Sequence, residues 1–232
     1  MMDIRRADER GRTNWAWLDS RHTFSFGEYY DPENMGFRAL RVINEDLIAP
    51  RGGFPMHPHR DMEIITYVVS GEVAHRDSHG HESVVRAGEV QRMSAGGGVF
   101  HSEYNPSREK PLHLLQVWIL PERGGGPFSY EQRSLAEALR TNKLVLAASR
   151  SGREGSISIQ QDVDLWASRP KGGDEFAFEL RPGRHVWLQL VSGRLRVNSR
   201  EVSAGDALYG EEAGRLQITA LEDADFLLFD LA

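Results

Sequence analysis

Two short glycine-centred sequences occur twice in this chain. Val69-Ser70-Gly71-Glu72-Val73 returns as Val191-Ser192-Gly193-Arg194-Leu195, and Arg86-Ala87-Gly88-Glu89-Val90 returns as Ser203-Ala204-Gly205-Asp206-Ala207. Gly71 and Gly193 are 122 residues apart, and Gly88 and Gly205 are 117 apart, so one unit is repeated with few insertions. A chain of 232 residues then holds two copies of a small fold.

Short strand-like segments surround these glycines. They are rich in β-branched and aromatic residues, several alternate with polar ones, and turn residues separate them. One short helix is expected over 134–140, and the glycine-rich stretch 121–127 is the clearest linker. We therefore predict an all-β protein made of two small jelly-roll β-barrels or sandwiches packed together, with domains 1–122 and 123–232. The strands are expected at 22–30, 37–43, 64–69, 112–120, 143–148 and 157–166.

The first half carries two pairs of possible metal ligands beside glycine-rich turns. His57 and His59 are two residues apart, as are His101 and Glu103, and in a strand such residues project from one face. Nine histidines in 232 residues produce one such pair by chance fairly often, but two pairs in this setting favour a metal site. Three imidazoles and a carboxylate suit Fe, Mn, Co, Ni, Cu or Zn rather than Mg or Ca.

Periodicity alone does not show which glutamate supplies the carboxylate ligand. Glu63 would share a face with His57 and His59 if one strand ran unbroken, so Glu63 and Glu103 both qualify. Thiolate chemistry is excluded because the chain has no cysteine.

These residues carry a resemblance to a known family. His57-x-His59-x-x-x-Glu63 with Gly71, followed by Gly88, His101 and Asn105, is similar to the two histidine motifs of the cupin superfamily. A longer motif resembles the pirin family of bicupins: His57-Pro58-His59-Arg60-Asp61-Met62-Glu63, with Met93-Ser94-Ala95-Gly96 and His101-Ser102-Glu103. Within that family, His22-Thr23-Phe24-Ser25-Phe26 and Tyr29-Tyr30-Asp31-Pro32 resemble bacterial members described as quercetin 2,3-dioxygenases.

The resemblance implies a site and a reaction. It favours Glu103 as the fourth ligand beside His57, His59 and His101, with Glu63 orienting a ligand imidazole. One divalent transition metal is expected, Fe ahead of Mn, Co, Ni, Cu and Zn. The implied activity is the opening of a flavonol such as quercetin at its 2,3 bond with O₂ and release of carbon monoxide. Glu103 would also act as the base. The alternatives are a metal- or redox-sensing regulatory protein of the pirin type and a zinc-dependent cupin isomerase or hydrolase.

The second half lacks this ligand set. Alignment on the repeated glycines places Glu179, Arg181 and His185 opposite His57, His59 and Glu63, and no histidine follows His185. The C-terminal barrel is therefore expected to hold no metal.

Other histidines of the first half are expected to have structural roles, and a pocket is expected beside the metal. His75, His79 and His81 are expected around a polar hairpin tip rather than in a second metal cluster. His113 is expected to be a hydrogen-bonded core residue. A flat aromatic pocket is expected beside the metal, with walls drawn from Phe54, Met56, Leu114, Gln116 and Trp118.

Charge and composition limit the kinds of partner and the cellular location that are expected. The net charge is −6 and the basic residues are scattered, which argues against direct nucleic-acid binding. The charged N-terminus and the absence of a long apolar run predict no signal peptide and no membrane span, so the cytoplasm is the expected location. The oligomeric state stays open, with a monomer as the default.

Overall fold

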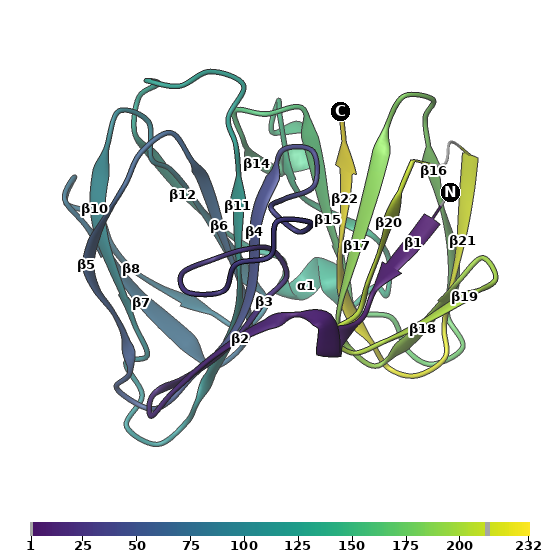
Figure 1. Ribbon diagram of the computed structural model, residues 1–232, viewed down its shortest axis with the longest axis horizontal. Helices are drawn as coiled ribbons and strands as arrows, with labels where there is room; N and C mark the ends of the chain where they lie inside the picture. Colours follow the sequence, from purple (N-terminus) through teal and green to yellow (C-terminus); the bar gives the residue numbers. More distant parts are fainter. Residues whose placement is uncertain (1, 212–213) are drawn as a thin grey trace. The chain divides into compact units, whose positions relative to one another are not determined.

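The computed structural model describes residues 2–211 and 214–232, and these residues are almost entirely β-strand (Figure 1). The chain divides into two compact units. The N-terminal unit comprises residues 11–134 and 159–161, and the C-terminal unit comprises 1–10, 135–158 and 162–232. Each unit contains one seven-stranded and one four-stranded sheet. The prediction of an all-β protein with two copies of one fold is confirmed, and each unit is a jelly-roll sandwich of two sheets rather than a closed barrel.

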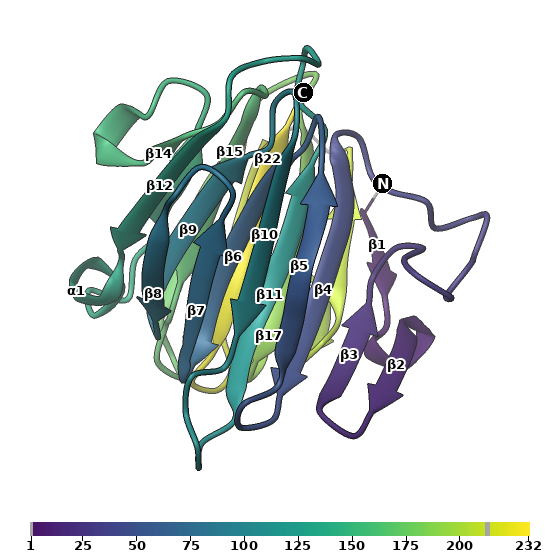
Figure 2. The same cartoon turned by 90° about the vertical axis from the view of Figure 1, so that its left-hand side faces the viewer.

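In the N-terminal unit the two sheets lie in layers, as Figure 2 shows with β5, β10, β7 and β8 in front. The seven-stranded sheet has the order β12 (Ser129–Ser134), β9 (Glu89–Ser94), β6 (Glu63–Ser70), β11 (Leu112–Ile119), β4 (Leu40–Ile48), β3 (Leu18–His22) and β2 (Gly11–Trp15). The four-stranded sheet has the order β5 (Gly53–His59), β10 (Val99–Tyr104), β7 (Glu72–Asp77) and β8 (Glu82–Arg86).

Apolar side chains fill one end of this sandwich, and polar ones cross its middle. A buried cluster packs between the sheets, with Trp17 and Phe54 against it. One row of residues paired across five strands is polar instead. The apolar cluster is Leu18, Ile48, Val68, Val73, Val85, Leu112 and Leu114. The polar row is His22, Asn44, Gln116, Thr66 and Gln91, on β3, β4, β11, β6 and β9 in that order.

The C-terminal unit repeats the arrangement. Its seven-stranded sheet has the order β1 (Met2–Arg5), β20 (Ala207–Gly210), β17 (His185–Ser192), β22 (Asp225–Leu231), β15 (Val163–Ser168), β13 (Val145–Ser149) and β14 (Ile157–Ser158). Its four-stranded sheet has the order β16 (Glu175–Leu180), β21 (Gly214–Ala220), β18 (Arg194–Val197) and β19 (Arg200–Ser203). The expected short helix is α1 (Ala136–Leu139), and two 3₁₀ turns cover Ala7–Glu9 and Arg153–Gly155.

The repeated glycines occupy equivalent turns. Gly71 and Gly193 have φ of 80° and 81° and join β6 to β7 and β17 to β18. Gly88 and Gly205 have φ of 78° and 85°. Only glycine adopts this left-handed backbone without strain, which explains why these positions stand out in both halves.

The division between units differs from the boundary expected at residue 122. Residues 1–10 belong to the C-terminal unit because β1 pairs with β20, and residues 123–134 belong to the N-terminal unit because β12 pairs with β9. Local sequence gives no indication of which sheet a strand joins, so this exchange was not predictable from composition.

Some strand boundaries also differ from expectation. β6 and β11 lie where they were expected, but the segment expected as a strand over 22–30 leaves its sheet after His22. Gly27 has φ of 58°, and Phe26 and Tyr29 exchange backbone hydrogen bonds around it, so a tight turn replaces the strand. Within the described residues, no helix is both long and apolar enough to cross a membrane.

Candidate metal centre

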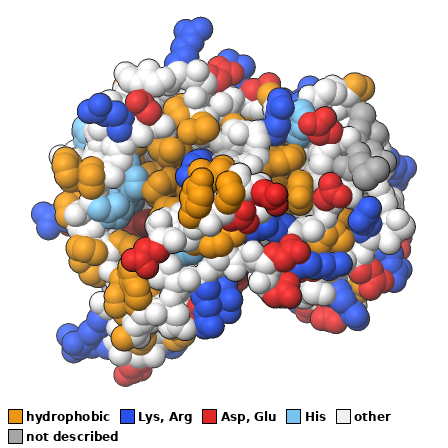
Figure 3. Space-filling model, in the orientation of Figure 1, with side chains coloured by type: hydrophobic (Ala, Val, Ile, Leu, Met, Phe, Trp, Pro, Cys, Tyr) orange, Lys and Arg blue, Asp and Glu red, His pale blue; other side chains and the backbone are white. Residues whose placement is uncertain are grey.

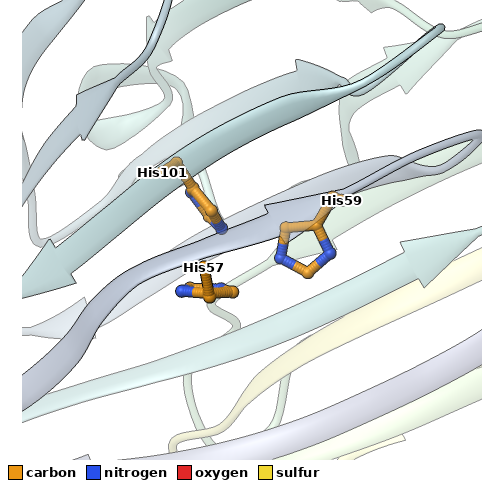
Figure 4. A group of neighbouring side chains, drawn as sticks. All are labelled: His57, His59 and His101. Carbon is orange, nitrogen blue, oxygen red and sulfur yellow. The ribbon is translucent and has the colours of Figure 1, made fainter.

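Three histidines converge on the inner side of the four-stranded sheet of the N-terminal unit. β5 and β10 run antiparallel with His57 opposite His101 and His59 opposite Val99. The centroids of the His57 and His101 rings are 4.4 Å apart, and each lies 4.8 Å from that of His59. Figure 4 shows the three rings turned toward one another. Each offers a ligand nitrogen within 4.8 Å of the other two.

The local sequence of β5 explains how His57 is presented. β5 is an edge strand, which is where Pro55 and Pro58 are tolerated because they donate no hydrogen bond to the sheet. The pairing with β10 shifts register between His101 and Glu103, as in a β-bulge. The Nδ1 atom of His57 lies 2.7 Å from the carbonyl oxygen of Pro55. With its proton donated there, the ring keeps its Nε2 lone pair for a ligand.

The imidazoles of His59 and His101 are neutral around physiological pH. Burial is the main cause that lowers the pKa of His59 to about 3, with smaller effects of His101 and His57. Burial also lowers the pKa of His101 to about 3, helped by His57 and His75. A metal ion needs deprotonated ligands, so these side chains are already in the binding form.

Glu103 is buried on β10 and held by three hydrogen-bond donors from the opposite sheet. Its Oε1 accepts from Thr66 Oγ1 at 3.2 Å and from Gln91 Nε2 at 2.9 Å, and its Oε2 accepts from Gln116 Nε2. Gln91 also donates to Thr66 Oγ1 at 3.0 Å, which links two of the donors. The carboxylate is therefore oriented by β6, β9 and β11 together.

The donor set fits a transition ion. A carboxylate offers about four lone-pair sites, so three hydrogen bonds leave one, on Oε2. Glu103 lines the same cavity as the three histidines, and its charge acts on His59. Three imidazoles with one carboxylate oxygen form a site of borderline softness.

Glu63 does not orient a ligand imidazole, which corrects the role expected for it. The chain turns between β5 and β6, where Asp61 has φ of 50°, so Glu63 begins a new strand instead of continuing the face of His57. Its carboxylate accepts from Ser94 Oγ at 2.9 Å and from the Gln160 backbone N–H at 3.2 Å. Burial raises its pKa.

A second group of possible ligands lies behind the first. His75, His101 and Glu103 are all buried and offer ligand atoms within 4.8 Å of one another. His75 Nε2 lies 3.3 Å from Asp77 Oδ2, and Asp77 Oδ1 also accepts the backbone N–H groups of His79 and His81. The hairpin tip expected around residues 77–81 is present, with Asp77 organising it.

A cavity of about 260 Å³ opens onto the histidines. Phe26, Phe54 and Trp118 form aromatic parts of its wall, and the rings of His59 and Trp118 pack edge-to-face with centroids 4.8 Å apart. Figure 3 shows histidines reaching the surface among hydrophobic side chains, over the part of the N-terminal unit where Figure 1 draws β5 and β10. The volume lies slightly below the about 300–1,000 Å³ typical of small-molecule pockets.

Not every expected wall residue lines this cavity. Phe54, Gln116 and Trp118 do, whereas Met56 is 50% exposed outside it and Leu114 is buried in the apolar cluster. His113 is half-buried and its Nε2 lies 3.0 Å from Glu45 Oε1. In the C-terminal unit, His185 pairs with Glu211 at 2.7 Å.

Sequence reasoning missed Thr66 and Gln91, which hold Glu103. The available signal was a single polar residue in the middle of an apolar strand, as in Ile64-Ile65-Thr66-Tyr67-Val68. A buried polar group of this kind needs a partner, and here the partner is the site carboxylate.

Comparison with known proteins agrees with this architecture. A family model described as pirin matches residues 4–119, and one described as the quercetinase C-terminal cupin domain matches residues 146–231. The chain is 47% identical over 231 residues to quercetin 2,3-dioxygenase of Escherichia coli (strain K12), covering 100% of this chain and 99% of that protein. It is 40% identical over 233 residues to a pirin-like protein of Caulobacter vibrioides, covering 100% of both.

Solved structures agree as well. The bacterial pirin YhhW from Escherichia coli in complex with nickel(II) is 46% identical, with a TM-score of 0.94 over 100% of this chain and 99% of that one. Two cupin-type sandwiches, the first with a histidine-lined cavity, define a bicupin. The chain belongs to the pirin family.

Proposed function

We propose that this protein is a metal-dependent dioxygenase that opens a flavonol such as quercetin at its 2,3 bond with O₂ and releases carbon monoxide. The observation that carries the proposal is the meeting of three imidazoles and a buried carboxylate in one aromatic-walled cavity. The relatives named quercetin 2,3-dioxygenase support the substrate and the reaction.

His57, His59, His101 and Glu103 are proposed to hold one divalent transition ion, with Fe as the native metal. A nickel(II) complex is known for the 46% identical relative, which supports a metal in this family but leaves Fe as our own choice. A redox-capable ion supplies Lewis acidity toward an enolic substrate and the electron-transfer chemistry that O₂ requires.

The side chains of the cavity then position the substrate and its proton. Glu103 is the proposed base for the substrate 3-hydroxyl, and its Oε2 carries the one lone pair that the hydrogen bonds leave. Thr66, Gln91 and Gln116 fix the direction of that lone pair. Phe54 and Trp118 offer apolar surface to a flat ring and exclude water from the reacting face.

The test is turnover with defined metals. Metal-free protein is reloaded with Fe(II) or Ni(II) and given quercetin with and without O₂, and O₂ uptake, flavonol decay and carbon monoxide are measured. We expect one O₂ consumed per carbon monoxide released, only with metal and only in air. His101→Ala serves as the inactive variant and His185→Ala as the active control.

The same assay separates the alternatives. Metal-dependent capture of a protein partner without turnover would favour a regulatory binding protein, and conversion that proceeds without O₂ would favour a cupin isomerase or hydrolase. Either result contradicts the dioxygenase.

A further inference from the structure

The cavity has a second polar region, separate from His57, His59 and His101 and from the hydrogen bonds to Glu103. Thr13 on β2, Ser20 and His22 on β3, and Asn44 and Asp46 on β4 all line it. Four of these, all but Thr13, are almost completely buried. Polar groups are costly to bury without partners, so a cluster of them in an otherwise aromatic pocket calls for an explanation.

Most of this region is satisfied internally. Ser20 Oγ donates to Asp46 Oδ1 at 2.5 Å, and Thr13 Oγ1 lies 2.8 Å from His22 Nε2. His22 Nδ1 lies 2.8 Å from Asn44 Oδ1. These bonds hold the Asn44 carboxamide with its oxygen toward β3.

Two complementary atoms are left over. The Asn44 Nδ2 group is a double donor, and Gln116 Oε1 is an acceptor because Gln116 Nε2 is turned to Glu103. Among residues 2–211 and 214–232, neither atom has a hydrogen-bond partner. Asn44 is only 4% exposed, it lines the cavity, and it is the direct cross-strand partner of Gln116.

The row of paired residues shows where this donor–acceptor pair lies relative to Glu103. Glu103 contacts Gln116, Gln116 is paired with Asn44, and Asn44 is paired with His22. Moving along the row therefore leads away from the carboxylate and toward β3. A flat molecule that has one oxygen beside Glu103 and extends along this row places its far portion over Asn44.

We propose that Asn44 and Gln116 bind a hydroxyl group on the part of the substrate remote from the reacting oxygen, and that they make the enzyme selective for flavonols hydroxylated there. This inference rests on the proposed function. A phenolic hydroxyl donates to Gln116 Oε1 and accepts from Asn44 Nδ2, which satisfies both atoms. A ring without that hydroxyl leaves both atoms unpaired against carbon, and sites of this kind discriminate strongly.

Binding in the absence of O₂ tests the proposal without turnover. Nickel-loaded full-length protein is titrated with quercetin, with galangin, which lacks only the two catechol hydroxyls, and with 3-hydroxyflavone, which keeps only the reacting hydroxyl. We expect quercetin to bind at least about tenfold more tightly than 3-hydroxyflavone, as one buried hydrogen bond would give. Galangin tells which ring carries the hydroxyl: weak binding assigns the catechol ring, and tight binding the fused ring.

Asn44→Leu should reduce this preference to about twofold or less while leaving nickel content unchanged. Because leucine also removes the His22 contact, Asn44→Asp is the second variant: it keeps an acceptor oxygen for His22 and loses the N–H donors. Glu45→Gln, next in the strand and outside the cavity, is the matched control. In air, Asn44→Leu should raise KM for quercetin with kcat changed less than about threefold.

Equal affinity of the wild type for quercetin and 3-hydroxyflavone, or a preference that survives both Asn44 variants, overturns the inference. Neither result affects the dioxygenase proposal if turnover persists. Conversely, selective binding without O₂ uptake overturns the reaction and leaves the selectivity in place.

Discussion

Glu103 accepts three hydrogen bonds from its own protein before any ligand reaches it. One lone pair is left, so the carboxylate either donates to a metal or accepts a proton at a given moment. Doing both at once would need a second free lone pair, which Oε2 lacks while it accepts from Gln116 Nε2. The roles of ligand and base are therefore separated in time.

Replacing Glu103 with Gln tests this residue directly. The change keeps the shape and removes the charge and the base, so part of the metal should stay on the three histidines while turnover falls by about 10²–10⁴. Metal content and aerobic quercetin decay are measured together. Glu63→Gln is the matched control, because Glu63 contacts Ser94 and Gln160 rather than a histidine. Normal turnover in Glu103→Gln with loss in Glu63→Gln would mean that the wrong carboxylate has been chosen.

The histidines are tested by metal content alone. His57→Ala or His101→Ala removes one of three converging nitrogens and should leave less than about a tenth of the wild-type metal after dialysis, since a single ligand change costs strongly at such sites. His185→Ala should leave the content unchanged, because His185 pairs with Glu211 in the C-terminal unit. Metal that survives both of the first two substitutions would contradict the site.

At the scale of strands, the sequence correctly predicted which side chains share a face of one strand, because that depends only on local spacing. His57 and His59 share a face of β5 because they are two residues apart, and the structure places them together. The choice between Glu63 and Glu103 depended on a turn at Asp61, which periodicity does not show. The donors to Glu103 come from three strands whose alignment is set by register over long distances. The local pattern marks Thr66 as a buried polar residue, but it does not show which group Thr66 contacts.

Trp118 on β11 is the element-scale test of the pocket. Its ring packs on His59 and Phe26 and lines the cavity, so Trp118→Ala should weaken quercetin binding by about tenfold, in keeping with the loss of an aromatic contact. Metal content should change far less. Met56→Ala is the control, because Met56 is exposed and does not line the cavity. Unchanged affinity in Trp118→Ala, measured by ligand titration, would remove this residue from the binding surface.

At the scale of the whole molecule, the two units keep one fold with different chemistry. The C-terminal unit retains a large apolar core, while Glu179, opposite His57 in the repeat, is exposed beside Arg215. Burial of apolar faces is enough to specify the sandwich, so ligand residues can be lost without loss of the fold. The sequence repeat therefore predicted the architecture of both halves but not the exchange of the N-terminal strand.

That exchange links the first ten residues to the stability of the C-terminal unit. β1 adds four paired residues to the edge of β20, and Met2 is buried in the C-terminal core. Beyond β1, Arg6 Nη1 and the Ala7 backbone N–H each donate to Asp206 at 2.8 Å. A chain that begins at Gly11 loses all of these contacts.

We expect the shortened chain to lose stability in its C-terminal unit and to keep its metal ligands. Burial of one methionine contributes about 1.5–3 kcal/mol, and the lost partners of the buried Asp206 add about 1–3 kcal/mol. At about 4–8 °C per kcal/mol for a domain of this size, the transition of this unit should fall by at least about 10 °C. Calorimetry with and without nickel provides the measurement, because only the melting temperature of the N-terminal unit should rise when metal binds.

Arg12→Ala is the control: Arg12 forms an exposed ion pair with Asp19 in the N-terminal unit, and such pairs contribute little to stability. An unchanged thermal profile would mean that β1 is dispensable, and loss of nickel binding with an intact C-terminal transition would mean that these residues serve the metal centre instead.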